Sequence, residues 1–255
     1  VKDVATRKIV HSESWLVALV GIVVAVSMML TGPLSTLLNN ATTTKYMLSD
    51  TTVSKANELA KEVQSEAITM LKTDDSNLPL SNKKVNVFGW GSTNPVYGGT
   101  GSGSMSDQYE TVSMLDGMKQ AGIETNSELT KLYTDYRKDR PVVAMWSQDW
   151  TLPEVPAKQY SDKLISDAKD FSDEAVITIT RVGGEGADLP TNMKEKVITY
   201  NNNYKDYEDF KDGEPFLQLS QTERDMIDLV TKNFKKETLV YNAANAFEFD
   251  FLYQY

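Results

Sequence analysis

Four short runs of β-branched and aromatic residues, separated by patterns of helical period, limit the possible folds more than any other feature of this sequence. The runs cover residues 85–90, 142–146, 175–182 and 238–242. The amphipathic patterns cover residues 110–121, 127–138, 158–171 and 220–234. Strands that alternate with helices form a mainly parallel sheet with helices on both faces. The sequence therefore predicts an α/β fold, a three-layer α/β/α sandwich.

One uncharged apolar run lies apart from this alternation, near the start of the chain. Residues 15–38 carry no charge, and about 24 residues are enough to cross the hydrocarbon core of a membrane. Three basic residues precede the run and the next one is Lys45, so the positive-inside rule predicts a cytoplasmic N-terminus at residues 1–14. We expect one single-pass transmembrane helix with the globular part extracellular. A cleaved signal peptide is the alternative, since it has the same basic start and apolar run.

The rest of the chain divides into a linker and a globular domain. Residues 39–50 are polar and predict a linker. Residues 51–255 are expected to form the domain, and they open with an amphipathic helical pattern that continues to Leu71.

Charge and composition exclude several classes of function. The formal net charge is −10, with 36 acidic and 26 basic residues, whereas nucleic-acid binding needs clustered Lys and Arg. An uncharged partner such as a sugar fits better. The chain has no cysteine, and its single histidine, His11, lies beside the apolar run. Acid–base chemistry must therefore use carboxylates, lysines or tyrosines, and no metal or organic cofactor is implied.

A glycine-rich segment follows the first predicted strand. Residues 98–105 read Gly-Gly-Thr-Gly-Ser-Gly-Ser-Met. The spacing fits neither phosphate-binding template, because no Gly-Lys-Ser/Thr follows and Ser104 stands where a third glycine would be needed. Glycine clusters also occur where the backbone must approach a ligand closely. A plain flexible loop explains the segment equally well.

A second unusual loop follows the strand predicted at residues 175–182. Residues 181–190 read Arg-Val-Gly-Gly-Glu-Gly-Ala-Asp-Leu-Pro, with Glu185 between glycines. Ligand sites in parallel α/β folds lie at the carboxyl ends of strands, where such a carboxylate is well placed to donate a proton. By composition alone, an ordinary surface turn remains the alternative.

These loops, taken with two later segments, resemble a known family. The later segments are Leu217-Gln-Leu-Ser-Gln-Thr-Glu223 and Leu239-Val-Tyr-Asn-Ala-Ala-Asn245. Together with residues 85–90, the glycine-rich segment and the Gly-Glu-Gly-x-Asp core, they match in order and spacing over roughly residues 52–252. The chain resembles the second, sandwich domain of glycoside hydrolase family 3, in the subgroup where this domain precedes a barrel domain.

The resemblance implies a fold and an activity. It implies a six-stranded α/β sandwich that packs against a barrel domain, with the active site between them. It implies that Glu185 is the general acid/base of a retaining β-glycosidase, most often a β-glucosidase, and that the nucleophilic aspartate belongs to the barrel domain, outside this chain. Arg181 and Asp188 become candidates for loop ordering or substrate contact, and Trp90 and Trp146 for stacking on a sugar ring.

Two alternatives from other classes stay open. One is a non-catalytic carbohydrate-binding or scaffolding domain of the same fold. The other is a membrane-anchored ligand receptor, which explains the apolar run and the acidic charge but not the Gly-Glu-Gly-Ala-Asp loop. The sequence stops at Tyr255, where the family continues, so we expect this fragment alone to be inactive.

Overall fold

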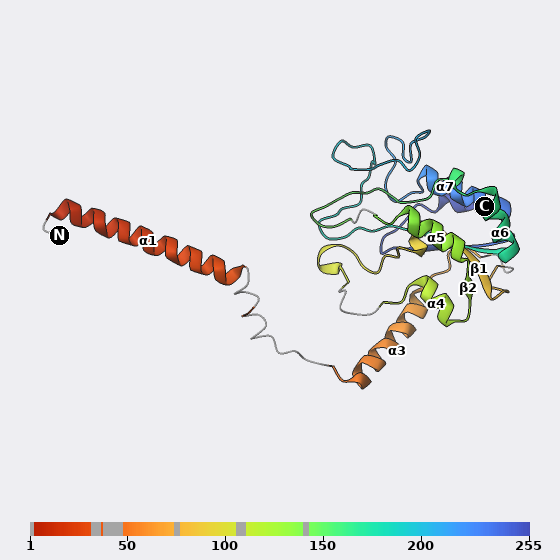
Figure 1. Cartoon of the computed structure of the whole chain (residues 1–255), viewed down its shortest axis with the longest axis horizontal. Helices are drawn as coiled ribbons and strands as arrows, with labels where there is room; N and C mark the ends of the chain where they lie inside the picture. Colours follow the sequence, from red (N-terminus) through yellow and green to blue (C-terminus); the bar gives the residue numbers. More distant parts are fainter. Residues whose placement is uncertain (1–2, 32–36, 38–47, 74–76, 106–110, 140–142) are drawn as a thin grey trace. The chain divides into compact units, whose positions relative to one another are not determined.

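The computed structural model describes residues 3–31, 37, 48–73, 77–105, 111–139 and 143–255. The chain divides into two compact units, Val1–Leu71 and Lys72–Tyr255, which are described separately (Figure 1). Parts of several predicted segments lie outside the described residues, among them most of the linker at 39–50 and several positions of the run at 15–38.

Two helices of the first unit lie within the described residues. Helix α1, Val4–Leu30, is capped by Asp3 and includes the polar residues before the apolar run. Its 27 residues span about 40 Å at 1.5 Å per residue. By length and composition it is a candidate membrane span, although a signal sequence meets the same criteria. Helix α3, Asp50–Ala67, confirms the next predicted helix but not its extension to Leu71, because the backbone becomes extended at Ile68.

The second unit is built on a parallel sheet, which confirms the predicted α/β fold. Its strands are β1 (Lys84–Phe88), β2 (Glu124–Thr125), β3 (Glu174–Thr180) and β4 (Lys236–Asn242). They lie in the order β2-β1-β3-β4, and every pair is parallel. The described residues thus form four strands, whereas the family resemblance implied six. Every residue of β3 is buried, as expected of a central strand covered on both faces.

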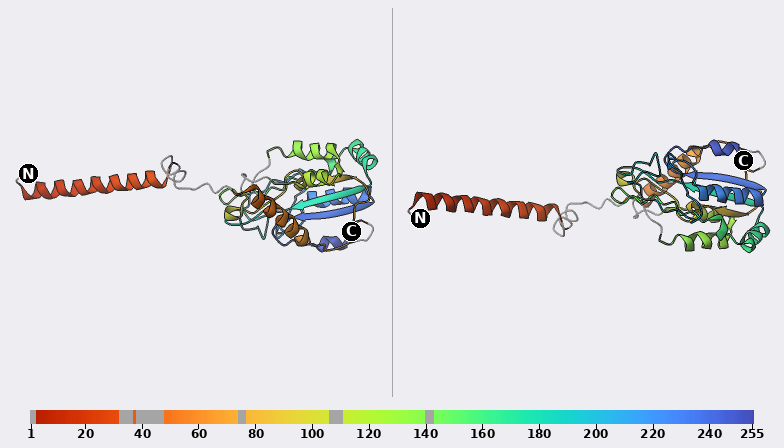
Figure 2. Two further views of the ribbon diagram at one scale, coloured as in Figure 1. Left: turned by 90° about the horizontal axis from the view of Figure 1, so that it is seen from below. Right: turned by 90° about the horizontal axis from the view of Figure 1, so that it is seen from above.

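Helices flank the strands, as Figure 2 shows. They are α4 (Met114–Gln120), α5 (Ser127–Tyr136), α6 (Asp162–Phe171) and α7 (Gln221–Asn233). Val85, Val87 and Val176 point to one face, where residues of α4 pack against them. The opposite face carries Phe88 and Ile177 and packs against α5, α6 and α7 in the main core. Four short 3-10 turns complete the unit: Trp90–Ser92, Gly101–Gly103, Ala157–Gln159 and Asp250–Tyr253.

The strand predicted at residues 142–146 is wrong. Residue 142 lies outside the described residues, and the rest form a tight turn. Ala144 N–H donates to the Ser147 carbonyl at 2.8 Å, and Ser147 N–H donates back at 3.2 Å, with Trp146 at the tip. Because short apolar runs have no distinctive period, an apolar turn and a strand cannot be told apart in the sequence. The two-residue strand β2 was not predicted.

Candidate functional site

Glu185 lies at the tip of a tight turn that follows β3. The turn is closed by hydrogen bonds between Gly184 and Ala187, at 3.3 and 3.0 Å. Gly186 has φ +69°, the left-handed value that the third position of a type II turn requires. The glycines beside Glu185 therefore shape a turn that leaves its side chain exposed to solvent.

The glycine-rich segment contacts this turn directly. Ser102 N–H donates to Glu185 Oε2 at 2.7 Å, and the Thr100 hydroxyl donates to the Glu185 carbonyl at 2.8 Å. A Cβ atom on Gly101, whose φ is +63°, would lie 2.5 Å from Glu185 Oε2. Only glycine gives the Glu185 side chain this space. The segment that fitted no phosphate template thus supports the backbone and the carboxylate of Glu185.

The hydrogen bond from Ser102 also favours the ionised form of the carboxylate. The backbone N–H of Ser102, helped by its hydroxyl, holds the pKa of Glu185 below the ordinary value for a glutamate. Donors that face a carboxylate stabilise its ionised form. In this chain Glu185 is therefore held as an acceptor rather than as an acid.

A third segment completes the surroundings of Glu185. The Gln148 side chain donates to the Gly186 carbonyl, and a Cβ atom on Gly186 would lie 2.5 Å from Met145 Cγ. The turn at residues 144–147 therefore packs against the Glu185 turn at Gly186. Three loops that are distant in the sequence meet at one point.

Arg181, the first residue after β3, is buried. It donates to three backbone carbonyls, those of Thr180, Phe216 and Gln218. It also forms a bidentate ion pair with Glu223, with both N–O distances 2.7 Å. The rings of Phe216 and Phe247 lie 5.1 and 5.0 Å from the guanidinium carbon. These bonds use all five N–H groups of an arginine, which leaves none for a ligand in this structure.

The other predicted site residues, Trp90, Trp146 and Asp188, differ in how far they are exposed to solvent. Trp90 lies in the core directly after β1 and exposes only 3% of its surface. Trp146 is 92% exposed at the tip of the turn whose Met145 touches Gly186. Asp188 is exposed on the Glu185 loop. The structure thus brings Trp146 and Asp188 to the surface beside Glu185, whereas Trp90 presents no face to a ligand.

A second carboxylate lies buried beneath the loops. Glu154 Oε2 accepts from the Trp90 backbone N–H at 3.1 Å, and Oε1 accepts from the Val155 N–H at 2.9 Å. Burial, with a smaller contribution from the Glu223 charge, raises the pKa of Glu154 to about 8. Its position in the core, 0% exposed, makes it a structural group and not a site residue.

Comparison with known proteins identifies the fold. Residues 68–253 match the family model described as the glycosyl hydrolase family 3 C-terminal domain. The chain belongs to glycosyl hydrolase family 3.

Relatives of this family 3 chain are β-glucosidases. The Ruminococcus albus β-glucosidase is 27% identical over 199 residues, which cover 76% of this chain and 18% of the relative. β-Glucosidase A of Butyrivibrio fibrisolvens is 26% identical over 196 residues, covering 72% of this chain and 22% of the relative. The chain thus spans about a fifth of the length of these curated relatives.

Solved structures of β-glucosidases are similar in fold. β-Glucosidase 3B from Thermotoga neapolitana, in complex with α-D-glucose, superposes with a TM-score of 0.54 at 28% identity, covering 74% of this chain and 24% of that one. A β-glucosidase from Paenibacillus barengoltzii gives a TM-score of 0.55 at 25% identity, with 72% and 18% covered.

Several contacts of the family 3 site were not predicted. Gln148 and Thr100 carried no signal, because each acts through a single hydrogen bond to a backbone carbonyl. Glu223 forms a capping box with Ser220 at the start of α7, and its pairing with Arg181 was not predicted. Within the described ranges, no group of three or more His, Cys, Asp or Glu side chains is placed to hold a metal ion.

Proposed function

We propose that this chain carries the acid/base domain of a retaining β-glycosidase, with Glu185 as the proton donor and acceptor. The observation that carries the proposal is the placement of Glu185, an exposed carboxylate on a glycine turn at the carboxyl end of the central strand β3. A group that must reach the glycosidic oxygen of a bound sugar needs this combination of exposure and fixed backbone.

Glu185 supplies one of the two carboxyl groups that the reaction needs. Retaining enzymes place a nucleophile and an acid/base about 5–5.5 Å apart across the scissile bond. We propose that the nucleophilic aspartate comes from a barrel domain outside these 255 residues. Glu185 would first protonate the leaving oxygen and then deprotonate the water that releases the sugar.

The lowered pKa of Glu185 fits a site that two domains complete. A general acid must be protonated near neutral pH, and the bond from Ser102 opposes this. Apolar or anionic groups that close over Glu185 would raise its pKa again and make donation possible. Assembly with the barrel domain and substrate is therefore the step that would prepare the acid.

The other site residues take supporting roles in this proposal. Arg181 orders the start of the Glu185 loop through its pair with Glu223. Asp188 and the exposed Trp146 contact the substrate, Trp146 by stacking on a sugar ring. We propose terminal β-D-glucosides as the substrates, because the relatives are named β-glucosidases. Helix α1 tethers the domain to a membrane, with the domain outside the cell.

One observation favours a second candidate, a non-catalytic carbohydrate-binding domain of the same fold. The Glu185 carboxylate is engaged by Ser102 and held in its ionised form, which suits an acceptor for a sugar hydroxyl as well as it suits a resting acid/base. Kinetics distinguish the two functions.

The test replaces Glu185 in the protein that joins this domain to its nucleophile domain. Glu185→Ala should lower turnover on the order of 100- to 10,000-fold for glucosides with poor leaving groups. A dinitrophenyl glucoside should lose much less, since its leaving group needs no proton. Added azide should restore turnover and yield a β-glycosyl azide, because azide attacks the glycosyl-enzyme without a base.

A matched control is Asp170→Ala, which removes an exposed carboxylate of α6 and should leave these rates unchanged. Equal loss for all leaving groups, a lower melting temperature and no azide rescue would show that Glu185 is structural. Asp188 or a carboxylate of residues 204–214 would then be the next candidate.

A further inference from the structure

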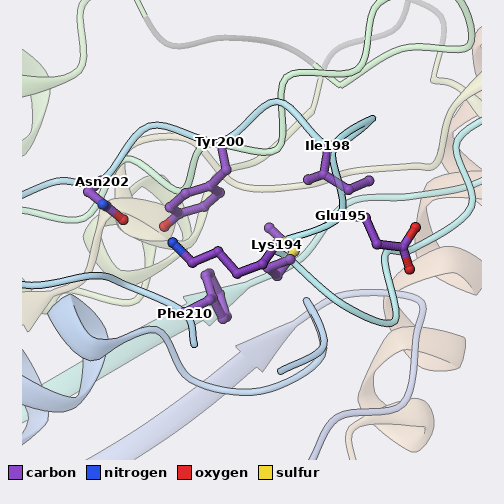
Figure 3. Close-up of a pocket in the computed structure, with 7 residues that line it drawn as sticks. Lys194, Glu195, Ile198, Tyr200, Asn202 and Phe210 are labelled. Carbon is purple, nitrogen blue, oxygen red and sulfur yellow. The ribbon is translucent and has the colours of Figure 1, made fainter. Parts of the chain in front are cut away.

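One cavity, of about 160 Å³, opens among residues 193–210 (Figure 3). Its apolar lining is turned inward, since Met193 and Phe210 are only 4% and 1% exposed. The hydroxyl of Tyr200 is inaccessible to solvent. These three groups therefore belong to the core and offer a ligand no surface, unlike the exposed side chain of Glu185.

The turn that carries Glu185 has two possible backbone forms. Type I and type II turns differ in the orientation of their central peptide group, which here joins Glu185 to Gly186. Glu185 has a negative φ and Gly186 a φ of +69°, which together match the type II form. Glycine adopts positive and negative φ about equally well, so Gly186 alone does not prevent the type I form. A contact from outside the turn can therefore decide between the two forms.

The Thr100 hydroxyl supplies such a contact. It donates to the Glu185 carbonyl, the oxygen of the central peptide group, at 2.8 Å. In the type I form this peptide group is turned over, so the oxygen would point away from Thr100. Thr100 is only 6% exposed, and a buried hydroxyl that loses its acceptor destabilises the structure. The hydrogen bond therefore favours the type II form.

The glycine-rich segment approaches the turn too closely for this contact to be a loose one. A Cβ atom on Gly184 would lie 2.6 Å from the backbone nitrogen of Thr100 and 2.9 Å from its hydroxyl oxygen. A Cβ atom on Gly99 would lie 2.9 Å from the Gly183 carbonyl oxygen. Backbone therefore packs directly on backbone, which fixes the distance between the Thr100 hydroxyl and the turn.

The same segment also holds the side chain of Glu185. Ser102 N–H donates to Glu185 Oε2 at 2.7 Å, so two residues of one segment hold the backbone and the carboxylate of Glu185 together. A change from type II to type I alters ψ of Glu185 by about 150°. Both hydrogen bonds therefore depend on one backbone form of the turn.

We propose that Thr100 is a positioning residue, whose hydroxyl selects the type II form of the turn and so directs the Glu185 carboxylate toward the position where it exchanges protons. The inference rests on the proposed function of Glu185. Thr100 acts through the backbone, and its hydroxyl rather than its methyl group is the part that matters. Without the hydroxyl, the turn exchanges between two forms and the bond from Ser102 is lost in one of them.

The first test measures the pKa of Glu185 by NMR in the 255-residue chain, kept in detergent, with Glu185→Gln to assign the titrating signal. In the parent, the bond from Ser102 holds this pKa below the ordinary value for a glutamate. Thr100→Val replaces the hydroxyl by a methyl group, so the pKa of Glu185 should rise toward the ordinary value. The amide signal of Gly186, which belongs to the central peptide group, should move as well. Thr100→Ser keeps the hydroxyl and should behave as the parent does.

The second test measures turnover in the protein that joins this domain to its nucleophile domain. Thr100→Val should lower turnover by about 10- to 100-fold for a glucoside with a poor leaving group, and by less for a dinitrophenyl glucoside. Thr100→Ser should keep most of the parent's rate. The matched control is Thr134→Val, which removes a hydroxyl bond to the Thr130 carbonyl, also 2.8 Å long, on α5. It should change neither the rates nor the pKa of Glu185.

The proposal is overturned if Thr100→Val leaves the pKa of Glu185 and the Gly186 signal unchanged, if Thr100→Ser changes them as much, or if turnover stays the same while they change. Should Thr100→Val not fold, Thr100→Ala is compared with Thr100→Ser instead, because alanine removes the hydroxyl without adding a methyl group against the carbonyl. Unfolding of Thr100→Ala as well would show that Thr100 is structural and would overturn the proposal. A raised pKa with equal loss for both leaving groups would support the selection of the turn form and contradict the acid/base role of Glu185.

Discussion

Two buried charged side chains of this domain, Arg181 and Glu154, differ in how their charge is compensated. Arg181 has an acceptor for each of its five N–H groups, including the carboxylate of Glu223. Glu154 accepts from two backbone N–H groups, and the charges of Glu223 and Asp209 near it have the same sign as its own. The arginine is therefore compensated, whereas the glutamate is not. Different responses to substitution and to pH follow.

Arg181→Lys should destabilise the domain strongly. A lysine has three donors for the five acceptors, so at least two buried oxygens lose their partner, at about 1–3 kcal/mol each. We expect the free energy of unfolding in urea to fall by about 2–4 kcal/mol, with the m-value unchanged. Lys163→Ala, which removes an exposed lysine paired with Asp167, is the control and should leave the midpoint where it is. A similarly small effect for Arg181→Lys would show that the network is dispensable.

Glu154 should make the domain less stable as pH rises. Its folded-state pKa is raised from 4.5 to about 8, so between these values the folded state binds a proton that the unfolded state has lost. The Glu154 contribution is most favourable below about pH 4.5 and is lost progressively up to about pH 8, by as much as about 5 kcal/mol.

Glu154→Gln, which keeps one oxygen as an acceptor, replaces the other by an amide nitrogen and cannot ionise, should flatten this part of the profile. The measurement is the urea midpoint at several pH values for parent and variant. If both proteins show the same slope between pH 5 and 8, the pKa of Glu154 is not raised in the folded state.

At the scale of elements, the site depends on how closely three loops approach one another. The Glu185 turn, the glycine-rich segment and the turn at residues 144–147 meet where side chains larger than hydrogen would collide. Gly101 is the clearest case, since a Cβ atom there would also lie 2.8 Å from Met145 Cε. The glycines therefore allow the loops to pack closely against one another, rather than making the loops flexible.

Gly101 and Gly103, both in the glycine-rich segment, make a matched pair for substitution. Gly101→Ala should push the Glu185 side chain out of place, and a displacement of about 1 Å lowers turnover on the order of 100-fold in the protein that includes the nucleophile domain. Gly103→Ala should have little effect, because its Cβ would meet no described atom within 4 Å. Equal rates for the two variants on a glucoside with a poor leaving group would rule out this role of Gly101.

Elements with a strong local pattern were predictable, and those set by tertiary contact were not. β1, β3 and β4 were confirmed because each is at least five residues long and contains β-branched residues beside other apolar ones, and α7 because Ser220 and Glu223 mark its start. β2 is two residues long and carries no pattern of its own. Residues 142–146 were mistaken for a strand because an apolar composition does not tell a turn from a strand.

Across the whole molecule, sequence motifs singled out the candidate site but not the contacts that build it. The Gly-Glu-Gly-x-Asp core and its place after β3 singled out Glu185, since strand ends of a parallel sheet converge. The pairing of Arg181 with Glu223 joins residues 42 positions apart, and no periodicity reports such a contact. The burial of Trp90 could not be predicted either, because a tryptophan at a strand end fits a position in the core as well as a surface that stacks on a sugar ring.

The two units of the chain also differ in whether their apolar side chains are buried or exposed. The second unit buries its apolar side chains in a core, whereas α1 has no buried residue and exposes its apolar side chains along the whole run from Trp15 to Leu30. An exposed apolar surface of this size needs a partner, and by length and composition α1 is a candidate membrane span or a signal sequence.

Membrane insertion predicts an orientation that can be measured. With the basic residues before the apolar run retained in the cytoplasm, protease added to intact cells should remove the domain and leave an N-terminal tag protected. Permeabilised cells should lose both. Val23→Arg, at the middle of the apolar run from Trp15 to Leu30, should release the protein from the membrane fraction, because a central arginine opposes insertion by about 2.5–3.5 kcal/mol. A soluble product that lacks roughly the first 40 residues would instead show that α1 is a cleaved signal, since a signal peptide and an anchor differ only in whether the chain is cut after the apolar run.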